Sequence, residues 1–264
     1  MLFNFAMVPL EEVQPWGKPG RLSLSWFGLT DSQYWVQAGT SVLLEYSDVA
    51  RRLGSSRYCD YQVARLYEDV MALLPYILEP VPADLIQYIS GDRSCVLERA
   101  TAWHAANSER DDDLYWEIID GSSTWIGNRS LHFSYLSPSA NILMWSDESL
   151  VHIEWDNRAK LVDGVCAWSA ECGSHSLPRS EFEEEVRSFH KRLMDEMSVR
   201  VSRVVAGGLP ADVHVDVPGL LREHEQRKLL PASAFELPSP HTDWQAVRKA
   251  LLAIDCQGSA DRWR

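Results

Sequence analysis

The sequence predicts an α+β fold in which antiparallel β-meanders are covered by amphipathic helices, with a helical C-terminal tail. The prediction depends on a long helical pattern at residues 181–206, on alternating strand patterns before it, and on an Asp163-Gly164 turn. We expect residues 1–264 to form a single compact unit, with lobes at 1–91 and 112–206 and the tail at 207–264. These patterns predict a fold class and a core, but they do not indicate a reaction.

The clearest predicted helix covers residues 181–206. Its apolar residues recur at steps of three and four, which places them on one side of a 3.6-residue helix. They are Phe182, Val186, Phe189, Leu193, Met197, Val201 and Val204. Ser180 and Glu183 have the spacing of a capping box, and Glu196 and Arg200 form an i,i+4 pair. We therefore expect a capped helix with one buried stripe.

Strand patterns precede this helix. Residues 151–155 alternate apolar with polar side chains, as a strand with one buried face does. His152 and Glu154 should therefore face outward, and a turn before them pairs this strand with residues 142–145. Asp163-Gly164 is typical of a type I′ turn and predicts a second hairpin.

The N-terminal half shows a similar order of a meander followed by a helix. Residues 22–26 alternate leucine and tryptophan with serine, and strands at 34–36 and 41–46 complete the predicted meander. A helix follows Asp60, its expected N-cap, and Pro75 should kink or shorten that helix.

The rest of the chain is less regular. Further expected elements are helices at 95–106, 218–230 and 242–253 and a strand at 131–136. Residues 111–125 are ambiguous, because Asp120-Gly121-Ser122-Ser123 interrupts this segment. Thr242 or Asp243 can cap the last helix, and a Pro/Ser-rich loop near 237–240 precedes it.

Composition narrows the class of protein. Apolar residues make up 45% of the 264 residues, which allows a sizeable core, and no apolar run approaches the ~20 residues of a membrane span. Residues 1–10 lack the basic start of a signal peptide, and the five cysteines are scattered, so we expect reduced thiols in a cytoplasm. The net charge of −13 argues against nucleic acid as a partner and permits a basic protein.

Sequence motifs for phosphate binding, hydrolase nucleophiles, zincins and kinases are absent, and we expect no cofactor. The best metal candidate is the set Cys166, Cys172 and His175, which lacks the fourth ligand of a structural zinc site. Asp111-Asp112-Asp113 could hold Mg²⁺ or Ca²⁺, but adjacent acids more often occupy a solvated loop or helix start. We therefore expect no metal.

The eleven tryptophans are unusual. Five of them fall on predicted strands, most facing inward: Trp26, Trp35, Trp145, Trp155 and Trp168. A Trp-rich core is the simpler interpretation. The alternative is an enzyme or small-ligand binder, for example of carbohydrate, with a Trp-lined cleft and His152, Glu154 or His175 as polar groups.

Acidic residues concentrate between residues 109 and 156, where ten acids face two arginines and supply −8 of the net −13. The candidate partner-binding residues are Asp111, Asp112, Asp113, Glu117, Asp147, Glu148 and Glu154. We expect these side chains to be solvated, because buried unpaired carboxylates are costly. If segment 109–120 lies beside the turn at 146–149, their fields add and speed association with a basic protein. The alternative is ordinary solubility charge.

Short motifs spread over nearly the whole chain carry a resemblance. They are Pro15-Trp16-Gly17, Leu24-Ser25-Trp26-Phe27-Gly28-Leu29-Thr30-Asp31, Tyr34-Trp35, Trp155-Asp156-Asn157-Arg158, Asp163-Gly164, the Phe182–Met194 helix and Thr242-Asp243-Trp244. With them the sequence resembles a bacterial family of unknown function, and the resemblance implies a single unit but no activity and no catalytic residues.

Our leading hypothesis is a non-enzymatic acidic binding protein, of immunity or regulatory type, that masks a basic protein partner. A broad acidic face would favour this hypothesis, and a deep pocket with converging histidines and carboxylates would favour the enzyme or ligand binder. The oligomeric state is left open.

Overall fold

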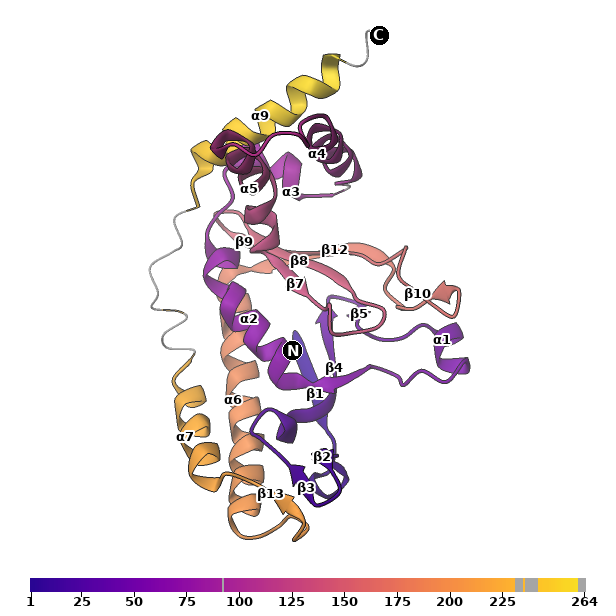
Figure 1. The fold of residues 1–264 in the computed structure, drawn as a ribbon, viewed down its shortest axis with the longest axis vertical. Helices are drawn as coiled ribbons and strands as arrows, with labels where there is room; N and C mark the ends of the chain where they lie inside the picture. Colours follow the sequence, from indigo (N-terminus) through magenta and orange to yellow (C-terminus); the bar gives the residue numbers. More distant parts are fainter. Residues whose placement is uncertain (92, 231–234, 236–241, 261–264) are drawn as a thin grey trace.

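The computed structural model describes residues 1–91, 93–230, 235 and 242–260, and it has the predicted α+β class. Antiparallel sheets and two long helices, α2 (Val63–Leu78) and α6 (Arg179–Val205), enclose the main hydrophobic core. A group of helices at one end of the molecule, which we call the helical end, surrounds a second hydrophobic cluster (Figure 1). Among the described residues, no helix is long and apolar enough to cross a membrane.

Helix α6 confirms the predicted amphipathic pattern. Its bounds differ by only one or two residues from the expected 181–206, and all seven residues of the predicted stripe are buried. At 1.5 Å per residue the helix is about 40 Å long, and it contacts strands of both large sheets. Figure 1 shows it running beside α2 along one side of the molecule.

Two local interactions predicted for α6 are wrong. The helix starts directly after Pro178 without a side-chain cap, so Ser180 lies inside the first turn. Arg200 is only 7% exposed and donates to the carbonyl oxygen of Leu29 at 3.0 Å, instead of forming an ion pair with Glu196. A buried carbonyl needs a donor more than a solvated carboxylate does, which explains why Arg200 turns inward.

The first large sheet is built around strand β4. Its strands are β1 (Phe3–Met7), β4 (Asp31–Ala38), β5 (Ser41–Leu43) and β6 (Cys59–Gln62). Strand β4 pairs with β1 on one edge and with β5 and β6 on the other, all antiparallel. Alternate residues of β4 are buried, and Trp35 is on the outer face, where it stacks on Tyr58 at 4.0 Å between ring centroids.

The predicted strand at 22–26 does not belong to this sheet. Strand β3 (Arg21–Ser23) pairs with β2 (Trp16–Lys18) and, in parallel, with β13 (Val213–His214) from the tail. Trp26 lies beyond the strand in a turn, fully buried, and its indole N–H bonds to a histidine of α7 (Val217–Lys228). The strand ends at Ser23 and pairs with the distant tail, and local alternation of residues does not indicate that partner.

Helix α2 starts later than expected. Asp60 pairs within β6, and the helix begins at Val63 after Gln62, whose side chain makes no cap. The amide of Ala64 instead bonds to the Thr30 hydroxyl at 3.3 Å. Pro75 lies within the assigned helix and does not end it. The short elements of this half are η1 (Leu10–Glu12), η2 (Gly28–Thr30) and α1 (Asp48–Arg52).

The second large sheet is the predicted meander. Its strands run in the order β7 (Ser130–His132), β8 (Asn141–Ser146), β9 (Leu150–Asp156) and β12 (Cys172–Pro178). The hairpin of β10 (Leu161–Val162) and β11 (Val165–Cys166) lies between β9 and β12 in the chain. Asp163 and Gly164 have φ values of 49° and 80°, as a type I′ turn requires. Strand β7 ends at His132, so the expected strand at 131–136 is shorter than predicted.

Strand β8 joins the two hydrophobic clusters. Ile142 and Met144 belong to the main core, whereas Leu143 and Trp145 belong to the second cluster. Both faces of this strand are therefore covered, which explains its uninterrupted apolar sequence. The helical end consists of η3 (Ala83–Leu85), α3 (Ile86–Ile89), α4 (Ser94–Ala106), α5 (Asp113–Gly127) and α9 (Trp244–Ala260).

Gly121 settles the ambiguity of residues 111–125. Helix α5 continues through it, and a β-carbon at Gly121 would lie 3.0 Å from the Ala250 β-carbon and 3.1 Å from the Ala246 carbonyl oxygen. The glycine therefore allows α9 to cross α5 closely instead of ending the helix. Helix α9 extends beyond the predicted 242–253, and the predicted loop near 237–240 lies outside the described residues.

Candidate functional site: an acidic helix face

The outward side of α5 carries most of the candidate residues near 111–117. Asp112 caps the helix, because its carboxylate accepts the Tyr115 amide at 2.8 Å. Tyr115, Ile118 and Trp125 point inward and are buried. The opposite side carries an exposed set at steps of three and four, which we call the acidic face of α5: Asp113, Trp116, Glu117 and Asp120.

A large aromatic side chain lies within this face. Trp116 is 51% exposed, and its indole N–H donates to the Asp111 carboxylate at 3.0 Å. The Tyr115 ring supports it in an edge-to-face contact at 5.1 Å between centroids. Neighbouring Leu114 is 41% exposed. An exposed, oriented tryptophan is typical of the anchor residues of protein interfaces.

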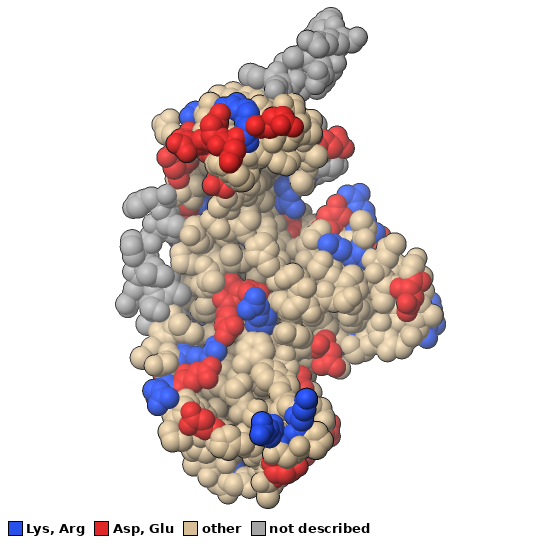
Figure 2. Space-filling model, in the orientation of Figure 1, with Lys and Arg blue, Asp and Glu red and all other residues tan. Residues whose placement is uncertain are grey.

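The charges of the acidic face are only partly compensated. Asp112 pairs with Arg110 at 2.8 Å and Glu117 with Lys249 at 2.9 Å, and the Tyr115 amide and Arg110 hold the pKa of Asp112 below its usual range. Asp113 and Asp120 form no ion pair with any described residue. Residues 94–127 and 242–255 together contain nine acids and four bases, a net −5. Figure 2 shows acidic side chains gathered over this end of the molecule, with a smaller basic group among them.

A groove between α5 and α9 continues the acidic face. Its volume is about 660 Å³, and its walls include Glu117, Asp120, Asp243 and Lys249. Asp243 accepts the amides of Gln245 and Ala246 and thereby caps α9, one of the two caps that the sequence predicts. Three carboxylates around one lysine favour a cationic side chain in this groove.

The acids of the β8–β9 turn form a separate group. Asp147 accepts the amides of Ser149 and Leu150 at 2.8 Å each, as well as a bond from His152. Partial burial acts to raise its pKa, but these hydrogen bonds outweigh it and hold the pKa well below the usual range. Among the described residues, no hydrogen bond or ion pair joins residues 147–148 to residues 109–120.

Glu154 corrects the prediction of an outward, solvated carboxylate. It is only 8% exposed and accepts the Trp145 indole N–H at 3.0 Å and the Gly91 amide at 2.8 Å. The polar face of β9 does point away from the main core, as predicted, but the segment after α3 covers it. Glu154 is therefore not available to a macromolecular partner.

The histidines of the alternative hypothesis do not converge. His152 and Glu154 line a cavity of about 320 Å³ with Trp155, but His175 pairs with Ile153 in the register and so faces the other side of the sheet. A β-carbon at Gly39 would lie 2.9 Å from His175 Nδ1, so the His175 ring packs against the β4–β5 turn.

The metal candidates Cys166, Cys172 and His175 are likewise not assembled. In the described part of the chain, no three His, Cys, Asp or Glu side chains are placed to hold one ion. Cys166 lies in the β10–β11 hairpin. Cys172 and His175 are three residues apart on β12, so their side chains face opposite sides of the sheet.

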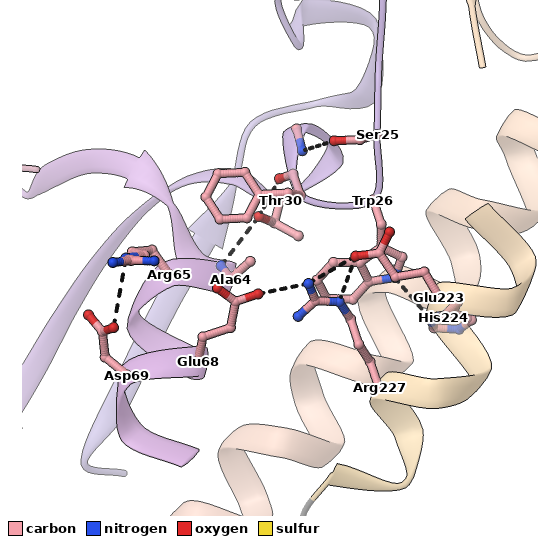
Figure 3. Close-up of polar contacts among 12 residues, drawn as sticks. Ser25, Trp26, Thr30, Ala64, Arg65, Glu68, Asp69, Glu223, His224 and Arg227 are labelled. Atoms are coloured by element: carbon pink, nitrogen blue, oxygen red, sulfur yellow. Dashed lines mark hydrogen bonds and ion pairs between the residues drawn. The ribbon is translucent and has the colours of Figure 1, made fainter. Parts of the chain in front are cut away.

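Sequence reasoning missed a hollow of about 720 Å³ beside Trp26 and α7. There the Arg227 guanidinium lies 4.1 Å above the Trp26 ring and pairs with Glu68 at 2.7 Å and Glu223 at 2.9 Å (Figure 3). His224 accepts the Trp26 indole N–H at 3.2 Å. Only Glu223 and Arg227 have a sequence signal, as an i,i+4 pair; the other contacts join distant segments.

Comparison with known proteins places the chain in one family. A family model described as a family of unknown function (DUF5984) matches residues 2–250, nearly the whole chain. Comparison with curated proteins and with solved structures gives no match. The chain therefore belongs to this family of unknown function, DUF5984.

Proposed function

We propose that the protein is an acidic binding protein of immunity or regulatory type, which masks a basic protein partner in the cytoplasm through the acidic face of α5. The observation that carries the proposal is the half-exposed Trp116 among Asp113, Glu117 and Asp120 on one side of a rigid helix. Trp anchors supply binding energy, and surrounding carboxylates select a partner of opposite charge.

The acid-walled groove between α5 and α9 supports the same partner chemistry. A lysine or arginine of the partner can enter beside Glu117, Asp120 and Asp243. Trp116 can then pack on apolar side chains of the partner that lie next to this cation. Cys59, Cys166 and Cys172 are free thiols, which agrees with a reducing compartment.

The test compares two double charge reversals. Asp113→Lys with Asp120→Lys alters the acidic face, and Glu12→Lys with Glu184→Lys makes the same change in net charge at exposed sites elsewhere. A partner captured from native cells is mixed with each variant in stopped flow at several salt concentrations. We expect the first variant to associate at least ~10-fold more slowly than wild type and to lose most of the salt dependence. The control should retain both.

Trp116→Ala provides an independent arm. We expect it to weaken binding mainly through faster dissociation, by about 2 kcal/mol or more. An association rate and salt dependence that are identical in wild type and Asp113→Lys/Asp120→Lys would contradict the proposal.

A further inference from the structure

A chain of hydrogen bonds lies on the face of the second sheet that is turned toward the helical end. The register places Trp145, His152 and Ser176 side by side on β8, β9 and β12. His152 Nδ1 lies 2.8 Å from the Ser176 hydroxyl, and His152 Nε2 lies 3.0 Å from the Asp147 carboxylate. Ser176 is exposed, and His152 is partly exposed.

The chemistry of the three groups fixes the direction of the hydrogen bonds. An ionised carboxylate only accepts, so His152 Nε2 carries a proton and donates it to Asp147. In neutral His152 the lone pair is then on Nδ1, and the Ser176 hydroxyl donates to it. The three groups are arranged like the serine, general base and orienting carboxylate of a hydrolytic triad. Here, however, His152 Nδ1 faces the serine and Nε2 faces the carboxylate, the reverse of the arrangement in serine proteases.

Buried neighbours hold the His152 ring in place. The Trp145 ring stacks on it at 4.1 Å between centroids, with 22° between the planes. The Trp145 indole N–H is held by buried Glu154. Asp147 is fixed in turn by the Ser149 and Leu150 amides. Each member of the chain therefore has a defined orientation before any ligand binds.

His152 and Ser176 open into the cavity of about 320 Å³ between β9, β12 and the segment after α3. Arg93, Arg158, Glu154 and Asp156 line the same cavity. Asp156 pairs with Arg158 at 2.6 Å, and buried Glu154 accepts the Trp145 and Gly91 N–H groups. The Arg93 guanidinium donates to the Ile89 carbonyl at 3.2 Å and forms no ion pair with any described residue. A half-buried guanidinium in the same cavity as a serine hydroxyl can bind a small substrate that carries a negative charge.

We propose that Ser176 is a nucleophile, His152 its general base and Asp147 a positioning residue, in a site that hydrolyses small anionic esters. Ser176 Oγ bonds to the acyl carbon while its proton passes to His152 Nδ1. The bond from the acyl carbon to the leaving oxygen then breaks, and His152 returns the proton to that oxygen. Water attacks the acyl-serine, giving one proton to His152, which passes it to Ser176 Oγ as the acid leaves. This activity is independent of the acidic face of α5.

The first test uses a fluorophosphonate linked to rhodamine. We expect it to label wild type at Ser176, identified by peptide mass, and not to label Ser176→Ala. Ser180 at the start of α6 is an exposed serine that does not line this cavity, so Ser180→Ala is the matched control and should label at the wild-type rate. His152→Gln should slow labelling by at least about 100-fold, as loss of a general base does.

The second test separates positioning from structure. In Asp147→Asn, the amide oxygen can still accept the Ser149 and Leu150 amides, but the amide nitrogen would donate to His152 Nε2. We expect the thermal midpoint to hold, the nitrogen-15 spectrum of His152 to show the proton on Nδ1, and labelling to slow at least about 10-fold.

The third test concerns the substrate charge. Hydrolysis of 4-acetoxybenzoate and of neutral 4-acetoxybenzamide is followed with wild type and Arg93→Gln. We expect the variant to raise KM for the anionic ester several-fold and to leave the neutral one unchanged. Wild type that is not labelled at Ser176 and cleaves neither ester faster than Ser176→Ala overturns the proposal.

Discussion

The main core and the helical end differ in the size of their hydrophobic clusters, and the cluster of the main core is much the larger. Most side chains of the main core are closed off, and Phe189 at the middle of α6 is 0% exposed between Phe3 and Tyr67. The helical end keeps Leu97, Trp116 and Leu252 at 63%, 51% and 62% exposed. Elements of the main core also expose apolar side chains, such as Val199 of α6 at 59%. The helical end differs in that its exposed Trp116 lies among acidic side chains, where a partner can use it.

A buried polar junction connects the two regions. Arg129, which is 0% exposed, pairs with Glu79 at 2.8 Å, and Glu79 also accepts the Thr242 amide at 2.9 Å. Helix α2 of the main core ends beside Glu79, and α9 of the helical end starts after Thr242. The attachment of the helical end therefore depends on a few buried charges in addition to apolar contact.

The largest effect is expected from breaking this junction. Arg129→Ala leaves the Glu79 carboxylate buried without its cation, which should lower the free energy of unfolding by about 3–5 kcal/mol. Urea unfolding measures the loss. Replacing both residues, as Arg129→Met with Glu79→Leu, should recover part of it, because no buried charge remains. A loss below about 1 kcal/mol for Arg129→Ala would show that the junction does not couple the regions.

The two hydrophobic clusters can be weakened separately. Phe189→Ala should cost about 3–5 kcal/mol and Leu251→Ala about 2–5 kcal/mol, since both side chains are buried. Hydrogen exchange should distinguish them: Phe189→Ala should speed exchange throughout, and Leu251→Ala mainly in α4, α5 and α9. Identical exchange patterns in the two variants would mean that the helical end has no separate stability.

The crossing of α5 and α9 offers a smaller perturbation. Gly121→Val should push α9 away from α5 and cost about 1–3 kcal/mol, because its β-carbon would meet Ala250 and Ala246. Ser123→Val, on the exposed side of the same helix, is the control and should change stability by less than about 0.5 kcal/mol. Equal thermal midpoints for the two variants would contradict the close crossing.

The smallest effect is expected from pH and concerns the main core. Burial lowers the pKa of His224, whose Nδ1 accepts the Trp26 indole N–H and whose Nε2 faces the Ser198 hydroxyl. The unfolded chain therefore binds the proton more readily, so stability is complete above about pH 6.5 and falls as the pH drops below it. His224→Gln keeps a donor and an acceptor without titrating, and the difference between its stability and that of wild type should shrink or reverse in acid. A difference independent of pH between 5 and 8 would refute this linkage.

Local sequence patterns correctly predicted the elements whose residues contact near neighbours in the chain, either along one helix or strand or across one tight turn. The α6 stripe, the alternation of β9 and the Asp163-Gly164 hairpin agree with the structure, because helical period, strand period and turn chemistry are properties of short segments. The concentration of acids near residue 112 is also visible in the sequence.

Tertiary structure decided the rest, because those outcomes depend on partners far away in the chain. Glu154 is buried since the Gly91 amide and the Trp145 indole satisfy it, and Arg200 turns inward to a carbonyl of residue 29. Gly121 continues a helix because α9 crosses there. The alignment of Ser176, His152 and Asp147 likewise requires the register of two strands and the shape of one turn, which composition and periodicity do not specify.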